Sequence, residues 1–219
     1  KEPDVIGMQE VRDYMLKDIN AVCRGYCSFA VGREDGIKGE QLAVLWKKAR
    51  FTLKDKGWFW LSDTPGTSSL GWDAKYKRIA VWSLFRDKVS GKQFYFINTH
   101  LDNKGAQARQ KGLGLIKDRM VEINKGKLPI ILTGDFNVAD TDSLVVGFNE
   151  EMSNCREEAR ITDHVKSFNA WGDESKSSTI DYIYFSGFKG CEAFKTHICP
   201  FNGREYLSDH YPITAKLVY

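Results

Sequence analysis

Five short clusters of acids, amides and histidines each follow an apolar, strand-like segment of this sequence. They stand in "IGMQEV", "FINTHLDN", "IILTGDFN", "STIDYI" and "LSDHYP". Ligand sites of α/β folds assemble at strand ends, because the sheet fixes the residues there while the ends stay accessible. We therefore predict that the five clusters form one site.

The polar residues of the clusters are Glu10, His100, Asp102, Asn103, Asp135, Asn137, Asp181, Asp209 and His210. Each cluster alone has a structural explanation, such as a helix-dipole partner for Glu10 or an Asx turn for Asp135. Together they form an oxygen-rich set with few thiols nearby, which suits Mg²⁺ or Mn²⁺ rather than zinc. His164 and His197 have no such neighbours, and we expect them to be surface or packing residues.

Length and composition indicate one globular domain over residues 1–219. Hydrophobic residues make up 42% of the sequence and charged residues 28%, which excludes disorder. No apolar run approaches the roughly 18 residues that span a membrane. The N-terminus lacks the features of a signal peptide, although a signal removed on export would leave the same sequence. We expect a soluble monomer, and the sequence leaves the localisation open.

The charge pattern permits an anionic substrate without demanding nucleic acid. The net charge is 32 − 29 = +3, and the lysines are scattered, whereas a binder of phosphate backbones usually has a clustered basic face. The five cysteines are an odd number in no zinc-binding pattern. We expect them to be mostly free, structural thiols.

The elements that must position the clusters alternate between strands and helices. Apolar, β-branched and aromatic residues predict strands over residues 3–9, 40–48, 78–85, 92–99, 128–135, 178–185 and 212–219. Helical spacing predicts one helix with Tyr14, Met15, Ile19 and Val22 on its apolar face, and a second with Leu113, Ile116, Met120 and Ile123. Mixed sheets covered by helices follow from this pattern.

Residues 56–78 read as a long connection that carries Trp58, Trp60 and Trp72. Large aromatic side chains in such a loop either pack down onto the core or contact substrate. Packing is the more common role of tryptophan, so we favour it for the loop as a whole.

The five motifs, in this order and spacing, resemble the signature set of the endonuclease/exonuclease/phosphatase superfamily. "GWFWLSDTP", "GWDA" and Arg78, placed before "NTHLD", further resemble a bacterial branch of it. The resemblance implies a four-layered α/β sandwich, in which two mixed β-sheets pack face to face between helices. It also implies a further strand, ending in asparagine, before residue 3, so we expect this sequence to be N-terminally truncated.

The resemblance also assigns roles to residues that match the motifs. Catalytic roles fall to His100, Asp135, Asn137, Asp181, His210 and Glu40. Metal binding falls to Glu10 and Asp209, and we expect contacts with substrate from Asn103, Arg78 and Trp72. Asp181 is expected to support the ring of His210, and Glu40 to orient the ring of His100.

These roles fit the hydrolysis of a phosphoester. A divalent cation on Glu10 would offset the charge of the phosphate, Asp135 would take a proton from a water, and Asn137 would position that water. We predict a Mg²⁺- or Mn²⁺-dependent phosphoester hydrolase, with phosphodiesters favoured and nucleic acid among the candidate substrates. The alternatives are a phosphomonoesterase for sugar or inositol phosphates and a non-catalytic binding relative.

Overall fold

The computed structural model describes residues 2–219, which group into two compact units. One unit extends to Asp135 and the other runs from Phe136 to Tyr219. That the chain forms a single domain over residues 1–219 stays a prediction.

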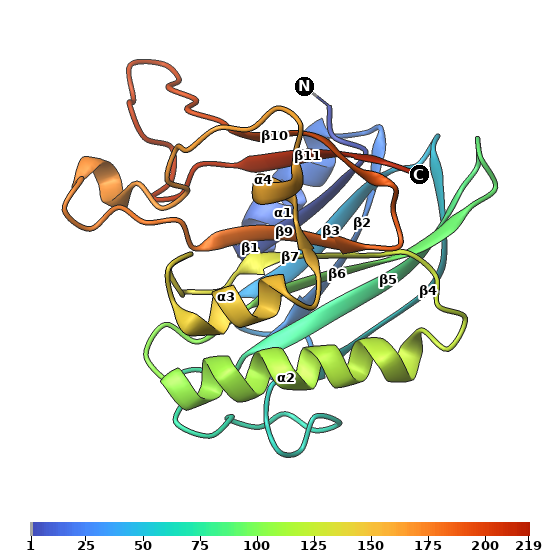
Figure 1. Cartoon of the computed structure of the whole chain (residues 1–219), viewed down its shortest axis with the longest axis horizontal. Coiled ribbons are helices and arrows are strands. Elements are labelled where there is room, and N and C mark those ends of the chain that lie inside the picture. Colours follow the sequence, from blue (N-terminus) through green and yellow to red (C-terminus); the bar gives the residue numbers. More distant parts are fainter. Residues whose placement is uncertain (1) are drawn as a thin grey trace. The chain divides into compact units, whose positions relative to one another are not determined.

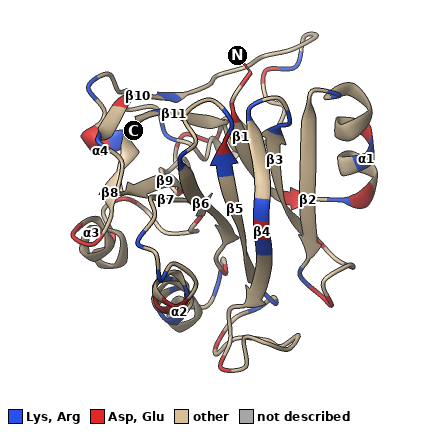
Figure 2. Cartoon of the chain, turned by 90° about the vertical axis from the view of Figure 1, so that its right-hand side faces the viewer, with Lys and Arg blue, Asp and Glu red and all other residues tan. Residues whose placement is uncertain are grey.

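The first unit contains a three-stranded sheet with the order β1-β3-β2, and both strand pairs are antiparallel. Its elements are β1 (Val5–Val11), α1 (Asp13–Val22), β2 (Tyr26–Gly32) and β3 (Gln41–Lys47). Strands β1, β3 and β2 lie side by side, with α1 next to β2 (Figure 2). The predicted strands at 3–9 and 40–48 are confirmed, and β2 is an addition to them.

Helix α1 forms where the sequence predicts it, but it packs through other residues. Leu16 and Ile19 lie against the buried cluster of Val11, Ala43 and Leu45. Tyr14 and Val22, expected on the apolar face, are 68% and 80% exposed, and Met15 is 38% exposed. With only three turns, the helix meets the sheet along a narrow stripe, so most of its apolar residues lie outside the contact.

The second sheet of this unit contains β4, β5, β6 and β7 in that order. The bounds of its strands and of the helix between β6 and β7 are β4 (Phe51–Trp60), β5 (Ile79–Asp87), β6 (Gln93–His100), α2 (Ala106–Ile123) and β7 (Ile130–Asp135). The β4–β5 and β5–β6 pairs are antiparallel, and β6–β7 is parallel, so this sheet is mixed. Part of the predicted long loop, residues 56–60, is strand β4. Antiparallel pairing with β5 through a bulge near Leu53 keeps it extended.

The two sheets of the first unit pack face to face. The rings of Trp46 in β3 and Phe85 in β5 lie 5.2 Å apart, and Phe85 also contacts Phe51 and Phe94. The opposite face of the second sheet is covered by α2 (Figure 1). The Tyr95 hydroxyl donates to the carbonyl of Ile123, the last residue of α2, at 2.9 Å. This unit therefore has the predicted order of helix, sheet, sheet and helix. The predicted α/β fold is confirmed, with antiparallel pairing in the first sheet and mixed pairing in the second.

A polar network is buried between these two sheets. Asn98 of β6 accepts hydrogen bonds from Gln9 at 2.7 Å and Thr133 at 3.1 Å, and its amide donates to the carbonyls of Met8 and Ala43. All the polar atoms of the Asn98 side chain are thus satisfied, as a buried amide requires. The network fixes the register of β1 against the second sheet.

The second unit is built on two antiparallel strand pairs, β8–β9 and β10–β11. Its elements are α3 (Ser143–Asn149), β8 (Ser153–Asn154), α4 (Cys155–Glu158), η1 (Ala170–Gly172), β9 (Asp181–Ser186), β10 (Gly190–Thr196) and β11 (Ile213–Val218). The predicted strands at 178–185 and 212–219 correspond to β9 and β11. Strand β10, which the sequence analysis lacks, is the antiparallel partner of β11.

Aromatic residues and thiols form the core of the second unit. Phe136 stacks on Tyr184, with ring centroids 5.7 Å apart. Cys155 and Cys191 are buried in a separate cluster with Phe185 and Phe194. All five cysteines are free, as the sequence predicts.

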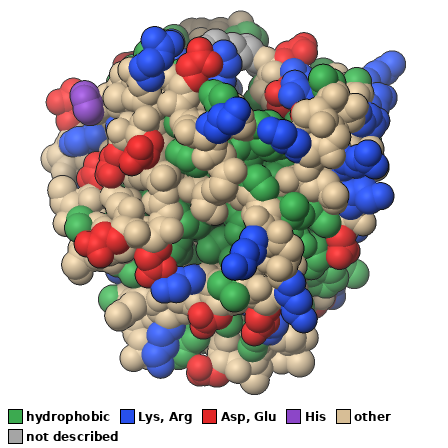
Figure 3. Space-filling model, turned by 45° about the vertical axis from the view of Figure 1, so that its right-hand side comes forward, with side chains coloured by type: hydrophobic (Ala, Val, Ile, Leu, Met, Phe, Trp, Pro, Cys, Tyr) green, Lys and Arg blue, Asp and Glu red, His purple; other side chains and the backbone are tan. Residues whose placement is uncertain are grey.

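Charged side chains of both signs are distributed over the surface. Figure 2 shows basic positions on β4 and positions of both signs on α1 and α2, and on the face in Figure 3 acidic side chains are interspersed among basic ones, with several basic side chains along the right-hand edge. The mixed pattern agrees with the scattered lysines of the sequence. Within residues 2–219, no helix is long and apolar enough to cross a membrane.

Candidate active site

His100 and Asp135 meet at the ends of two parallel strands of the first unit. They are register partners, His100 as the last residue of β6 and Asp135 as the last residue of β7. The Nε2 of His100 lies 3.3 Å from Oδ2 of Asp135, and the two residues are 6% and 5% exposed. The contact holds the imidazole ring against the carboxylate at this edge of the sheet.

Glu10 stands at an irregular turn of the backbone near the end of β1. Its φ is 57°, and the register of β1 against β3 shifts between Met8 and Val11. A bulge of this kind redirects a side chain at the edge of a sheet. Within residues 2–219, the carboxylate of Glu10 makes no hydrogen bond or ion pair, so its oxygens remain available to a ligand.

Glu10 and His100 line one pocket of the first unit. The pocket has room for about one water molecule. Its other lining residues are Arg33, Glu40, Gln41, Leu42, Lys77, Arg78 and Ile79. The sequence-predicted residues Glu10, Glu40, Arg78 and His100 are therefore brought together.

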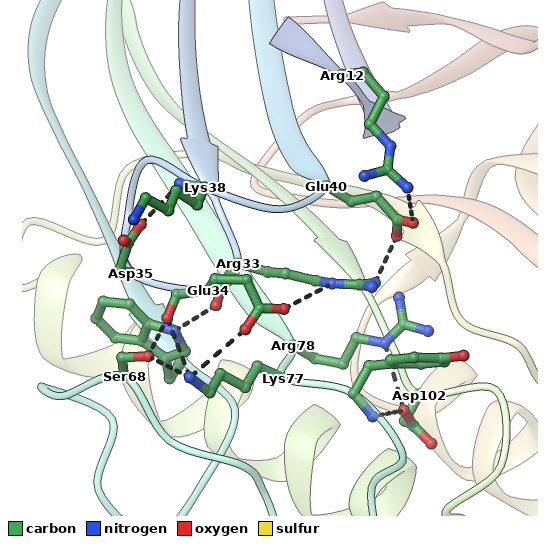
Figure 4. A network of polar contacts seen from close by, with 12 residues as sticks. Arg12, Arg33, Glu34, Asp35, Lys38, Glu40, Ser68, Lys77, Arg78 and Asp102 are labelled. Carbon is green, nitrogen blue, oxygen red and sulfur yellow. Dashed lines mark hydrogen bonds and ion pairs between the residues drawn. The ribbon is translucent and has the colours of Figure 1, made fainter.

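Glu40 does not hold the ring of His100, contrary to expectation. Its two carboxylate oxygens accept hydrogen bonds from Arg12 at 2.9 Å and Arg33 at 2.5 Å (Figure 4). The cause is the β2–β3 hairpin, whose backbone bond from Arg33 N to Glu40 O places the two residues side by side. Opposite charges that close together pair directly, and the carboxylate contact of His100 comes from Asp135 instead.

Arg78 is buried just before β5, with its side chain 6% exposed. Its Nε lies 3.5 Å from Oδ2 of Asp102, as Figure 4 shows. Burial lowers the pKa of Arg78, and the charge of Asp102 opposes that shift.

Asp102 organises the backbone around Arg78. Its oxygens accept hydrogen bonds from the backbone amides of Lys75, Tyr76, Lys104 and Gly105, at 2.9 to 3.1 Å. Burial alone would raise the pKa of Asp102, but these amides outweigh it and hold the pKa at about 2. The sequence analysis noted Asp102 without assigning it a role. Its position two residues after His100 was the available signal.

Two residues expected to contact substrate lie outside the pocket lining. Asn103 is exposed in the turn before α2. Trp72 donates from Nε1 to Asp63 at 2.9 Å, and the amine of Lys111 lies over its ring. Of the other tryptophans in that stretch, Trp60 is buried and donates to the carbonyl of Arg33. The favoured packing role is confirmed for Trp60, and Trp72 belongs to the contact with α2.

In the second unit, Asp181 and His210 form the expected pair. Nδ1 of His210 lies 2.8 Å from Oδ2 of Asp181. The ring of Phe168 packs against the imidazole, with centroids 5.0 Å apart. A carboxylate on Nδ1 fixes the orientation of the ring and leaves Nε2 to face a reacting group.

Ser167 and Asn169 support this pair, although the sequence analysis did not single them out. The hydroxyl of Ser167 accepts from the backbone amides of Ile180 and Asp181, and its carbonyl accepts from Tyr211 N at 2.7 Å. The side chain of Asn169 donates to the carbonyl of Ser208 at 3.1 Å. Serine and asparagine in a loop are too common to stand out in one sequence.

Asp209 and Asn137 occupy irregular segments of the second unit. The carbonyl of Asp209 accepts from the backbone amides of Asn169 and Ala170, and its carboxylate accepts from Ser208 at 3.3 Å. Asn137 has a φ of 51°, a left-handed conformation that asparagine adopts more readily than most residues. Each is partly accessible to solvent.

Each predicted metal ligand, taken in its own unit, offers the oxygen donors that suit a hard divalent cation. The predicted ligands Glu10 and Asp209 offer carboxylate oxygens, and no hydrogen bond within residues 2–219 occupies Glu10. Oxygen donors are the ligands that Mg²⁺ and Mn²⁺ prefer. The two remaining histidines are placed as expected, since His164 is exposed and His197 packs against Thr214 at 2.9 Å.

The fold and much of the sequence are shared with a bacterial phosphatase. A mannosyl-6-phosphatase of Bacteroides thetaiotaomicron VPI-5482 is 35% identical, with a TM-score of 0.90 over 99% of this chain and 85% of that chain. The structure of D. rerio TDP2 complexed with single strand DNA product has a TM-score of 0.75 at 16% identity, covering 96% of this chain and 84% of that one. The second likeness concerns the fold alone.

Sequence comparisons extend to a viral relative and to a family. The uncharacterized protein L388 of Acanthamoeba polyphaga mimivirus is 30% identical over 166 residues, which are 70% of this chain and 61% of that protein. The chain thus matches about three fifths of that relative's length. The sequence model of the Endonuclease/Exonuclease/phosphatase family matches residues 1–210. The chain therefore belongs to the Endonuclease/Exonuclease/phosphatase family.

Proposed function

We propose that this protein hydrolyses phosphoester bonds with the help of a divalent cation. The observation that carries the proposal is that each predicted catalytic histidine contacts a carboxylate, His100 with Asp135 and His210 with Asp181. A carboxylate stabilises an imidazolium, which can donate a proton to a phosphate oxygen or a departing alkoxide. Family membership supports the same reaction class.

Each predicted site residue has one role in the proposed hydrolysis. Asp135 accepts a proton from the attacking water, and the amide of Asn137 orients that water. His210, held by Asp181, donates to the phosphate, and His100 serves the leaving group. Glu10 and Asp209 would hold Mg²⁺ or Mn²⁺, which when bound offsets the negative charge of the phosphate.

Two lines of support bear on whether the substrate is a phosphodiester or a phosphomonoester. The sequence analysis favoured a phosphodiester, with nucleic acid among the candidates. The relative at 35% identity is described as a mannosyl-6-phosphatase, which supports the alternative, a phosphomonoester of a sugar. Our more specific hypothesis is that the substrate is a phosphomonoester.

The test is hydrolysis of p-nitrophenyl phosphate and bis(p-nitrophenyl) phosphate with Mg²⁺ or Mn²⁺, before and after excess EDTA. We expect turnover that EDTA abolishes and fresh metal restores. Asp135→Ala should lower kcat by about 10² or more, the scale for a positioned base. Asp118→Ala, an exposed site on α2, is the matched control. Full turnover in EDTA, or an Asp135→Ala variant as active as the control, would contradict the proposal.

A further inference from the structure

The guanidinium of Arg78 is buried without a hydrogen-bond acceptor. Its side chain is 6% exposed, and its Nε is a buried nitrogen with no hydrogen bond. No residue within 2–219 accepts a hydrogen bond from its terminal Nη groups either. Because Arg78 lines the pocket that holds Glu10 and His100, these groups are available to a ligand there.

The nearby acid does not satisfy this guanidinium. Asp102 lies 3.5 Å from the Nε of Arg78, and its oxygens already accept from four backbone amides. Asp102 therefore supplies compensating charge that keeps Arg78 buried, while the hydrogen-bonding capacity of the guanidinium stays unused. An arginine cannot deprotonate to escape this situation, so the buried Nε donor without an acceptor is unfavourable.

A second arginine stands beside the first. The guanidinium of Arg33 lies over the ring of Tyr76 at 4.7 Å, and that of Arg78 lies over the same ring at 5.6 Å. The side chain of Arg33 is 14% exposed, and its Nε also lacks a hydrogen bond. The guanidinium groups of Arg33 and Arg78 thus both contact the ring of Tyr76, which places two positive charges near each other.

Glu40 does not cancel this positive charge by itself. It shares its carboxylate between Arg33 and Arg12, so two arginines divide one acid (Figure 4). Lys77 adds a third cation to the pocket lining, and its amine donates to the Ser68 hydroxyl at 3.0 Å. Glu34 lies 3.6 Å from both the Nε of Arg33 and the Nζ of Lys77 and offsets part of their charge, so Arg78 is the cation of this wall with the most donors open to an anion.

We propose that Arg78 and Arg33 form the subsite for the nonbridging oxygens of a phosphate dianion, and that the substrate is a phosphomonoester. The planar fork of arginine matches two phosphate oxygens at once. A monoester presents three such oxygens and two negative charges, whereas a diester presents two oxygens and one charge. This inference rests on the proposed phosphoester hydrolysis for its kinetic part only.

The first test measures binding rather than turnover. Inorganic phosphate is titrated calorimetrically into the wild-type protein, Arg78→Met and Arg86→Met, each with Mg²⁺ and each without it. Arg86 is the matched control, because it is an exposed arginine on the same strand β5. We expect Arg78→Met to weaken phosphate binding by about 10- to 100-fold, the range for charge-assisted hydrogen bonds, and Arg86→Met to leave it unchanged.

The second test measures specificity. We expect the wild type to have a higher kcat/KM for p-nitrophenyl phosphate than for bis(p-nitrophenyl) phosphate. Arg78→Met should lower the ratio of kcat/KM for the monoester to kcat/KM for the diester by about tenfold or more. The diester has one nonbridging oxygen and one negative charge fewer, so it loses less binding energy when Arg78 is removed. Asp102 keeps its four backbone amides in this variant, so the fold should persist. Should Arg78→Met fail to fold, Arg78→Lys keeps the charge without the fork and should give a smaller loss in the same direction.

The outcomes separate the two proposals. Phosphate affinity in Arg78→Met within threefold of the wild type would overturn the subsite. A wild type that prefers the diester, or an unchanged ratio in the variant, would overturn the phosphomonoester assignment. Phosphate binding that depends on Arg78, in a protein that hydrolyses neither substrate, would support the subsite and reject the proposed hydrolysis.

Discussion

Replacing Asp102 with asparagine tests how the loop around Arg78 is held. The Oδ1 of Asp102 accepts from Lys75, Lys104 and Gly105, and Oδ2 accepts from Tyr76. Asparagine has nearly the same shape but only one acceptor oxygen. Its NH₂ group would face either the Tyr76 amide or the other three, so at least one buried donor would lose its acceptor.

The magnitude follows from the pKa of this carboxyl group. The pKa falls from 3.8 to about 2 in the folded protein, and each unit corresponds to about 1.4 kcal/mol, so ionisation contributes about 2 kcal/mol at pH 7. Because the folded pKa is depressed, this stability is present above pH 4 and is lost as the pH falls through 2. At pH 3 about 1 kcal/mol remains by the same relation. An unpaired buried donor adds about 1–3 kcal/mol to the loss in the variant.

The assay is urea unfolding of the wild type, Asp102→Asn and Asp118→Asn at pH 7 and pH 3. We expect Asp102→Asn to lower the free energy of unfolding by about 3–5 kcal/mol at pH 7, and by about 1 kcal/mol less at pH 3. Asp118 is exposed on α2 and serves as the control, with a change of about 0.5 kcal/mol or less.

Two results would refute the reasoning. A loss at pH 7 no larger than that of the control would mean that the backbone amides around Asp102 find other acceptors. An equal loss at both pH values would mean that the pKa of the Asp102 carboxyl group is the same in the folded and unfolded states. Its ionisation would then contribute nothing to stability.

Further predictions concern the histidine pair and the polar core. Asp181→Asn should reduce kcat nearly as much as His210→Ala, and the double variant should be little worse, since residues acting as a unit are not additive; losses that simply multiply in steady-state kinetics would contradict this. Gly7→Ala should lower the free energy of unfolding by about 1–3 kcal/mol, because its Cβ would lie 2.5 Å from Thr133 and 2.8 Å from Asn98. A melting temperature equal to that of the wild type would reject that packing argument.

The main strands and α2 could be predicted from the sequence because their signals are local. Runs such as "QFYFINT" and "PIILTGD" carry enough apolar and β-branched residues to specify a strand without knowledge of their neighbours. Leu113, Ile116 and Met120 at helical spacing are all buried in α2. The Asp181–His210 pair also follows from the motifs, since each residue lies in its own recognisable segment.

Other features depend on partners distant in sequence. Residues 56–60 carry strand-forming aromatic side chains but run into a Pro-, Gly- and Ser-containing stretch, and pairing with β5 holds them extended. The apolar residues of α1 are compatible with more than one buried face of the helix. Packing against Val11, Ala43 and Leu45 selects the face that carries Leu16 and Ile19. Neither contact can be inferred from the local pattern.

The sequence by itself determined the motifs and therefore the family, because both consist of residue types in a fixed order. Only the tertiary structure decided which charges meet. Glu40 pairs with Arg12 and Arg33, which the chain folds around it, and this leaves His100 to Asp135. Arg78 is an ordinary arginine in the sequence. Folding buries it beside Asp102, whose oxygens already accept hydrogen bonds from backbone amides. The strength of a charge interaction depends on burial and on competing partners. The proposed binding role of this guanidinium therefore comes from its folded environment.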